Sequence, residues 1–256
     1  MTEAKPRGRF VWYDLMIPDP AAAPAFYSKV TGWGTTEWPG GGPTPYTMWM
    51  NGDQPLGGIG KLEPGRGGPH WLGYISTPDI DETVTQTVDL GGKTMVPPTP
   101  IPTVGRFAIL TDPHGAVFAA FTPESNAPGH EGEAELREFS WHELATHDYP
   151  AAFRFYERLF GWEKMSEMDM GPSGTYLMFG RKGVMMGGMF NTSPQMPAPP
   201  GWLHYVLVDD VNRAVDAVKA GGGQVLNGPM EVPGGDWIAQ CMDPQGAMFA
   251  VHARKK

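Results

Sequence analysis

The sequence predicts an α+β protein built from two tandem copies of one domain. The opening segment, residues 10–14 (FVWYD), returns 129 positions later as residues 139–143 (FSWHE). A later segment, residues 71–74 (WLGY), returns 131 positions later as residues 202–205 (WLHY). Because the offset drifts by only two residues over a whole copy, both copies should share one topology and differ by small loop changes.

Length and composition restrict the class of protein. A chain of 256 residues, 41% hydrophobic and 18% charged, can form two globular domains with a core each. The net charge of −9, without a Lys/Arg cluster interleaved with aromatic residues, argues against a nucleic-acid partner. The single cysteine, Cys241, cannot form an internal disulfide. No apolar stretch reaches membrane-span length, so we expect a cytoplasmic protein without a membrane partner.

Each copy opens with a strand, a helix and a hairpin. Residues 10–17 alternate with apolar side chains on both faces, which predicts a covered strand. Asp19 and Pro20 are typical of a helix start, and the helix should run to Gly32. Two strands, 46–50 and 56–61, then flank a tight turn at Asn51-Gly52-Asp53. The second copy repeats these features with a helix over 151–160, capped by Asp148, and strands over 175–180 and 184–190.

The pattern then restarts within the copy. Residues 71–77 predict a strand, residues 79–90 a helix ended by two glycines, and residues 106–121 a hairpin that turns at Asp112-Pro113-His114-Gly115. Each copy therefore contains two βαβββ modules. The predicted domains span residues 8–122 and 137–253, and residues 123–136, rich in Pro, Glu, Gly and Ala, form the linker.

These motifs together resemble the vicinal oxygen chelate superfamily of glyoxalases, bleomycin-resistance proteins and extradiol dioxygenases. The resemblance rests on the paired modules, the Phe-Tyr…Gly-Trp helix, the Gly-Gly pair and the Asp-Pro-X-Gly turn before the last strand. More narrowly, the layout is similar to bacterial tandem glyoxalase-like proteins. The resemblance implies that each pair of modules forms a curled mixed sheet with its helices outside and a site in the cup. It also implies that the two domains pair as an internal pseudo-dimer.

The metal-ligand positions of the superfamily carry no metal-binding side chain in this sequence. In metal-dependent members, the ligands are His, Gln or Glu on the first and last strands of each module, which suits a divalent ion. By the resemblance, these positions fall on Trp12, Trp141, Ala119, Ala250, Leu72 and Leu203. None of these side chains can donate to a metal. We therefore expect no metal and no other cofactor.

Aromatic and thioether side chains are predicted to line the cup instead. Such walls suit a flat, partly apolar organic ligand, because methionine repacks around irregular shapes. The same residues could simply fill the core. The predicted ligand-binding residues are Trp12, Trp141, Tyr74, Tyr205, Met48, Met50 and Met186, with Trp49, Met185 and Met189 on the same hairpins.

Two carboxylates are the sharpest polar signal. Asp14 and Glu143 each lie two residues beyond a cup tryptophan, on the same strand face. An unpaired buried carboxylate would cost several kcal/mol, so each needs a partner or water. An ion pair, for instance with Arg106 or Arg154, would satisfy them. A substrate-facing acid or base, or a member of a displaced metal site, is the alternative.

The histidines give a weaker signal. His252 lies two residues past Ala250 on the last strand, hence on the same face, and is a third catalytic candidate, whereas its counterpart is Phe121. His142 and His204 alternate away from the cup and should lie at a sheet-helix or domain contact. The sequence shows no Ser-His-Asp spacing, phosphate loop or dinucleotide fingerprint.

Two functional hypotheses follow from these residues. The first is a metal-free protein that holds an aromatic or amphipathic metabolite or antibiotic, as the resemblance to bleomycin-resistance proteins implies. The alternative is a glyoxalase-type lyase or isomerase that uses Asp14, Glu143 or His252 in a rearranged site, with or without a metal. A third reading is that only one domain binds a ligand and the other is its structural partner.

Overall fold

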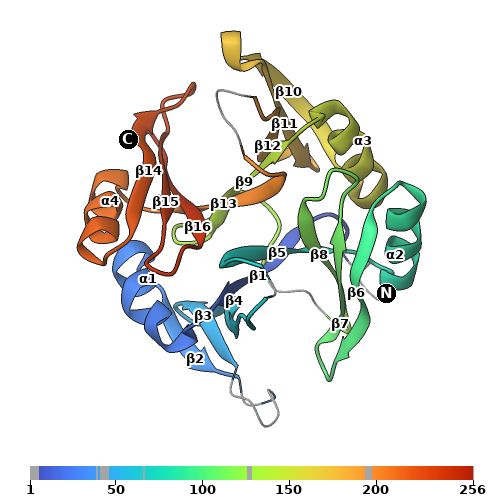
Figure 1. Ribbon diagram of the computed structural model, residues 1–256, viewed down its shortest axis with the longest axis horizontal. Coiled ribbons are helices and arrows are strands. Elements are labelled where there is room, and N and C mark those ends of the chain that lie inside the picture. The colour runs from blue at the N-terminus through green and yellow to red at the C-terminus, as the bar shows by residue number, and fades with distance from the viewer. Residues whose placement is uncertain are drawn as a thin grey trace. The chain divides into compact units, whose positions relative to one another are not determined.

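Each copy folds into one eight-stranded mixed sheet (Figure 1). The computed structural model describes residues 6–38, 40, 46–65, 67–125, 129–193 and 198–255. The first sheet has the strand order β2-β3-β4-β1-β5-β8-β7-β6, and the second has β10-β11-β12-β9-β13-β16-β15-β14. The two orders are identical position by position, which confirms the predicted repeat of one α+β topology.

The elements of the first copy follow the predicted order. They are β1 (Phe10–Ile17), η1 (Pro20–Ala22), α1 (Ala23–Thr31), β2 (Gly34–Glu37), β3 (Thr47–Asn51), β4 (Gln54–Lys61), β5 (His70–Ser76), α2 (Ile80–Asp89), β6 (Lys93–Ile101), β7 (Gly105–Thr111) and β8 (Val117–Pro123).

The second copy repeats this order of strands and α-helices, but its 3-10 turn η2 follows β10. Its elements are β9 (Phe139–Thr146), α3 (Tyr149–Phe160), β10 (Glu163–Asp169), η2 (Gly171–Ser173), β11 (Thr175–Arg181), β12 (Val184–Asn191), β13 (Gly201–Leu207), α4 (Val211–Ala220), β14 (Gln224–Glu231), β15 (Trp237–Met242) and β16 (Met248–Ala253).

The strands that follow each helix lie at the sheet edges. These four strands, β2, β6, β10 and β14, each end a sheet in the observed order. The position explains why β6 (KTMVPPTPI) tolerates three prolines, since a proline cannot donate to a ladder and is accepted at an edge. The same prolines hide the alternation by which a strand is read from sequence.

The helices begin and end where the sequence predicts. The Asp148 side chain accepts a hydrogen bond from the Ala151 backbone N–H, and α3 ends at Gly161, which adopts the left-handed conformation with φ 68°. In the first copy, Asp19 caps the short 3-10 turn η1, so α1 itself starts only at Ala23. Within the described part of the chain, no helix has both the length and the hydropathy needed to cross a bilayer.

The chain forms two compact units, and neither coincides with one copy. The first unit contains residues 1–12, 72–130 and 142–202, and the second contains residues 13–71, 131–141 and 203–256. Each unit thus combines a first module from one copy with a second module from the other. In the second unit, α1 and α4 lie side by side (Figure 1).

A buried Tyr-Asp-Trp group joins the two modules of the second unit. The Tyr27 hydroxyl on α1 donates to Asp243 Oδ2 at 3.0 Å and accepts from Trp71 Nε1 at 3.1 Å. The other carboxylate oxygen of Asp243 accepts the backbone N–H groups of Gln245 and Ala247, both at 2.9 Å. The aspartate of the Asp-Pro-X-Gly turn therefore orders its own turn and binds a helix from the other copy.

The first unit contains the same group with the copies exchanged. The Tyr156 hydroxyl donates to Asp112 Oδ2 at 3.3 Å and accepts from Trp202 Nε1 at 3.2 Å. Burial raises the pKa of Tyr27 and of Tyr156 well above the ordinary value, with a further contribution from the neighbouring carboxylate. Both phenols therefore remain protonated donors, as a buried carboxylate requires.

His204 is a core residue of the second unit. Its ring is 1% exposed, with edge contacts to Tyr13 and Phe139 at centroid distances of 5.4 and 6.2 Å. Desolvation by burial lowers the pKa of His204 from 6.5 to about 3. The imidazole is therefore neutral in the folded protein at physiological pH.

Loss of either tyrosine hydroxyl should destabilise the fold. Tyr27→Phe leaves Asp243 without one donor and Trp71 without its acceptor, and Tyr156→Phe does the same to Asp112 and Trp202. Each change should lower the free energy of unfolding by about 1–3 kcal/mol, measured by urea denaturation. Tyr149→Phe is the matched control, since no described residue accepts or donates a hydrogen bond at that hydroxyl. Equal stability of Tyr27→Phe and Tyr149→Phe would contradict this role.

The buried imidazole should make the protein sensitive to acid. Between pH 6.5 and about 3, the unfolded chain binds a proton at His204 that the folded chain does not. The free energy of unfolding should therefore fall by about 1.4 kcal/mol for each pH unit below 6.5. The variant His204→Leu should lack this part of the slope in urea titrations at pH 7.5, 6 and 5. If the two proteins show the same pH dependence, the imidazole is already charged in the folded state.

Candidate ligand-binding site

The two faces of the central strands differ in burial. In β1, Tyr13, Leu15 and Ile17 are buried, whereas the alternating residues are half-buried. We call the half-buried side the open face. It carries Trp12, Asp14 and Met16 in β1, and Trp141, Glu143 and Ala145 in β9. The two tryptophans and two carboxylates predicted for the cup thus share an open face on equivalent strands.

Strand pairing places one methionine of each copy in a row with the open-face carboxylate, whereas the predicted Met186 lies at a bulge. Asp14 lies opposite Gly58, and Gly58 lies opposite Met48, so the three residues form one row across the sheet. Met50 lies two residues beyond Met48 on β3 and is half-buried. In the second copy, the equivalent row is Glu143, Gly188 and Met178. Met186 is half-buried on β12, two residues before Gly188.

Three residues of the predicted hairpins do not belong to the open face. Trp49 is 0% exposed and packs against Tyr27, Trp33 and Trp71, and Met189 is also fully buried. Met185 is 44% exposed at the turn end of β12. The expectation that Trp49 and Met189 line the cup is therefore wrong. Their strands have large apolar residues on both faces, so side-chain type alone does not distinguish the two faces.

A tyrosine holds each open-face carboxylate. The Tyr46 hydroxyl donates to Asp14 Oδ1 at 2.6 Å, and the Tyr176 hydroxyl donates to Glu143 Oε2 at 2.9 Å. Each tyrosine ring crosses the glycine opposite its carboxylate, because a Cβ at Gly58 would collide with Tyr46 and a Cβ at Gly188 would collide with Tyr176. The same Tyr-carboxylate-Gly arrangement therefore occurs in both copies.

The expected ion pair with Arg106 is wrong. Arg106 forms a bidentate salt bridge with Asp81, with N–O distances of 2.6 and 3.0 Å, on an exposed surface. Arg154 is exposed on α3. Asp14 and Glu143 each accept a hydrogen bond from a tyrosine hydroxyl instead. Tyr46 and Tyr176 recur at a spacing of 130 residues, and this repeat could have identified them from the sequence.

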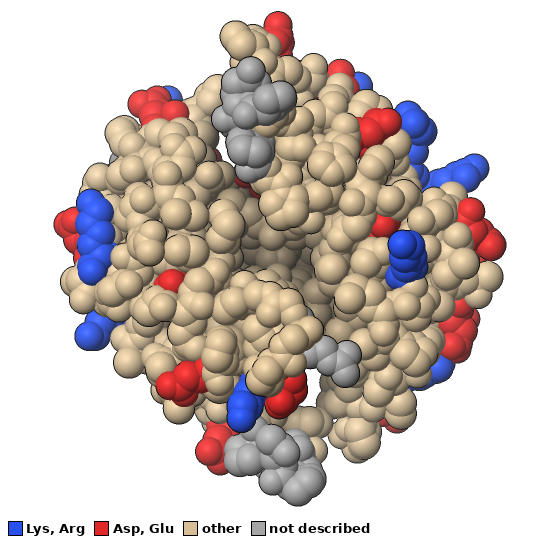
Figure 2. Space-filling model, viewed as in Figure 1, with Lys and Arg blue, Asp and Glu red and all other residues tan. Residues whose placement is uncertain are grey.

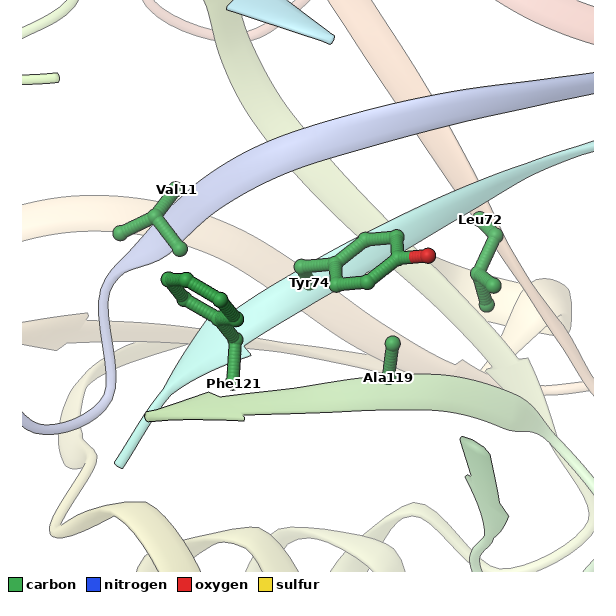
Figure 3. Packing of buried hydrophobic residues seen from close by; sticks show 5 residues of the cluster. All are labelled: Val11, Leu72, Tyr74, Ala119 and Phe121. Atoms are coloured by element: carbon green, nitrogen blue, oxygen red, sulfur yellow. The ribbon is translucent and has the colours of Figure 1, made fainter. Parts of the chain in front are cut away.

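In the first unit, the second module of copy one forms a buried apolar cluster with β1. Tyr74 and Leu72 of β5 pack with Ala119 and Phe121 of β8 and with Val11 of β1. Figure 3 shows Tyr74 between Phe121 and Leu72, above Ala119, with Val11 beside Phe121. The residues packed against this cluster are Trp12, Ile101, Val104, Phe107, Ile109 and Val117. Tyr74 is only 7% exposed. It therefore packs within this cluster and offers little surface to a ligand.

In the second unit, the equivalent module of copy two presents polar groups. Ser140 Oγ lies 2.9 Å from His252 Nδ1, and His252 Nε2 lies 3.0 Å from Asp236 Oδ2. Beside them, Gln240 Nε2 donates to the Tyr205 hydroxyl at 2.9 Å. A Ser-His-Asp chain is therefore present, contrary to expectation. Ser140 and His252 are 112 positions apart and meet through strand order, which linear spacing does not show.

The residues at the family's metal-ligand positions do not fit a divalent ion. Indole, methyl and isobutyl groups occupy those positions, and none offers a lone pair to a metal. In the described ranges, no three His, Cys, Asp or Glu side chains gather closely enough to hold one.

Two other features lie away from the open faces. A pocket of about 160 Å³ in the second unit lies between the end of α1 and the start of α4 and includes Lys29, Arg137 and Arg213 in its lining. Cys241 is fully buried, and desolvation raises the pKa of its thiol to about 12, so it packs as an inert side chain. On the face shown in Figure 2, the described acidic and basic residues lie among uncharged ones, and several acidic residues are next to a basic one.

Filling the glycine position should release the carboxylate. Gly58→Ala should displace Tyr46 and break its hydrogen bond to Asp14, which costs about 1–3 kcal/mol in the free energy of unfolding. The cost should be non-additive with Tyr46→Phe in a double-mutant cycle, because both changes break one hydrogen bond. Gly34→Ala is the control, since a Cβ there meets nothing within 4 Å. Additive losses would show that Tyr46 does not depend on Gly58.

Comparisons with known proteins agree with this architecture. Residues 9–119 and 138–251 match the model of the Glyoxalase/Bleomycin resistance protein/Dioxygenase superfamily. A relative from Mycobacterium tuberculosis, named "Putative glyoxylase CFP32", is 33% identical over 94% of this chain and 92% of its own length. The anthracycline biosynthesis protein DauV of a Streptomyces species is 28% identical over 98% of this chain and 94% of its own.

Solved structures share the fold at low sequence identity. The 2,3-dioxygenase LapB from Pseudomonas aligns with a TM-score of 0.69 at 12% identity, over 99% of this chain and 94% of its own. The Mn(II)-bound glyoxalase from Novosphingobium aromaticivorans aligns with a TM-score of 0.67 at 13% identity, over 98% and 84%. Both matched regions, each a curled eight-stranded sheet with helices, place the chain in the Glyoxalase/Bleomycin resistance protein/Dioxygenase superfamily as a tandem two-domain member.

Proposed function

We propose that this protein binds a planar aromatic or amphipathic small molecule on the open faces of its sheets, without a metal ion. The observation that carries the proposal is the repeated group of an indole, a thioether and a tyrosine-held carboxylate. The carboxylate and the thioether are Asp14 and Met48 in the second unit and Glu143 and Met178 in the first, and Trp12 and Trp141 lie two residues before the carboxylates on the same strands.

The chemistry of these groups favours an aromatic ligand with a polar edge. Apolar contact contributes about 25 cal/mol per Å² of buried ligand surface, so the indole and thioether surfaces would supply most of the affinity. Asp14 and Glu143 each accept a hydrogen bond from a tyrosine hydroxyl. They would orient the ligand through a hydroxyl or a protonated amine.

The relatives support this ligand class. DauV is named for anthracycline biosynthesis, and anthracyclines are fused-ring aromatic compounds that carry hydroxyl groups and an amino sugar. The dioxygenases and the Mn(II)-bound glyoxalase share only the fold at these identities. Because the ligand positions of this chain hold no metal-binding group, a binding function is more consistent with its residues than metal-dependent catalysis.

A binding titration tests the proposal. Quenching of intrinsic tryptophan fluorescence by 9,10-anthraquinone should saturate, and Trp12→Ala or Trp141→Ala should weaken binding about tenfold or more. Trp237→Ala is the control, since Trp237 is 40% exposed and lies on β15, away from the strands that carry Trp12 and Trp141. Fluorescence quenching that does not saturate would refute the proposal. Equal losses of affinity in all three Trp→Ala variants would also refute it.

Metal content separates this proposal from the glyoxalase alternative that the name of CFP32 suggests. Binding should survive EDTA, and elemental analysis of the purified protein should find no stoichiometric divalent ion. The contrary result would be EDTA-sensitive turnover of the methylglyoxal thiol adduct that is lost in Asp14→Asn or Glu143→Gln. That result would replace the binding function with a lyase.

A further inference from the structure

The two copies differ at a group of positions around β8 and β16, the last strands of their second modules. Four equivalent positions exchange an apolar or small residue for a polar one, while Tyr74 and Tyr205 keep the same type. The exchanged pairs are Val11 and Ser140, Phe121 and His252, Ile109 and Gln240, and Gly105 and Asp236. In copy two, all four polar residues enter hydrogen bonds with one another or with Tyr205. Such coordinated replacement indicates a built polar group and not scattered surface variation.

The hydrogen bonds determine where the protons lie. Burial alone would raise the pKa of Asp236, but hydrogen bonds from His252 and from the Lys255 backbone, with nearby positive charge, lower it below its ordinary value. The ionised carboxylate must accept, so Nε2 of His252 carries a proton. In the tautomer in which Nε2 alone carries a proton, Nδ1 accepts the hydroxyl proton of Ser140.

The distances around Ser140 support this direction. Its Oγ lies 2.9 Å from His252 Nδ1 and 3.4 Å from the Tyr205 carbonyl oxygen. The shorter contact takes the single hydroxyl proton, because hydrogen bonds weaken with length. The lone pairs of Ser140 Oγ therefore remain available to a donor. Ser140 is half-buried, and the His252 side chain is 14% exposed, so a bound group could be largely shielded from water.

We propose that the polar group in the second unit, formed by Ser140 of β9 and the second module of copy two, is a recognition site for an aromatic hydroxyl group, in which the ligand O–H donates to Ser140 and Ser140 donates to His252. Asp236 and His252 are positioning residues that keep Ser140 an acceptor. The inference rests on the proposed function. It adds the chemical class of the ligand and identifies the copy that recognises the ligand's hydroxyl group. Val11 and Phe121, at the same positions of copy one, cannot make these bonds.

Paired probes test this site against the general binding function. We would titrate the protein with 2-hydroxyanthraquinone and with 9,10-anthraquinone, which lacks the hydroxyl group. The wild type should bind the hydroxylated probe about tenfold more tightly, the usual effect of one added hydrogen bond. Ser140→Val, which installs the residue of copy one, should bring the two affinities to near equality. Ser140→Thr, which keeps a hydroxyl, should retain the preference, and Val11→Ala is the matched change in copy one.

Partial unfolding would weaken the binding of both probes alike. The ratio of the two affinities is therefore insensitive to folding defects. A preference that persists in Ser140→Val, or equal affinities in the wild type, would overturn the hydroxyl site and leave the binding function intact. A preference lost equally in Val11→Ala would also overturn it, since the site would not belong to copy two. Failure of both probes to bind would refute the binding function and the hydroxyl site together.

Discussion

The buried Tyr-Asp-Trp group is the interaction on which the architecture depends. It appears once in each compact unit, and in each case a tyrosine from the first module of one copy donates to the turn aspartate of the other copy. A buried carboxylate needs donors, and these two receive one phenol and two backbone N–H groups each. The Asp-Pro-X-Gly motif therefore connects modules as well as turning a hairpin.

Much of the fold could be predicted from the sequence because its signals are local. Helix caps at Asp148 and Gly161, the alternation in β1 and the repeat at nearly constant offset each rest on neighbouring residues. The edge strand β6 could not be located, since its prolines break the usual pattern and only its place at the sheet edge makes them tolerable. The compact units, which mix modules of both copies, also depend on contacts that no local pattern encodes.

The candidate site shows the same division. Open-face placement of Trp12, Asp14, Trp141 and Glu143 followed from strand periodicity. The partners of the carboxylates did not, because a tyrosine reaches across a glycine on the adjacent strand and nothing in linear order favours it over an arginine. The Ser140-His252-Asp236 chain was missed for a related reason: its members meet only when the first and last strands of the copy flank the same central strand.

The exchange of modules between copies makes the duplication indivisible. Severing the chain in the segment between the two sheets would give two halves, each with an orphaned tyrosine and an orphaned aspartate whose mates reside on the other half. Neither half would then be an autonomous folding unit, although each holds a complete set of strands for its own sheet. The two halves should therefore fold when they are mixed, because each supplies the partners that the other lacks. An ancestral single-copy form would have had to dimerise before the gene was duplicated and fused.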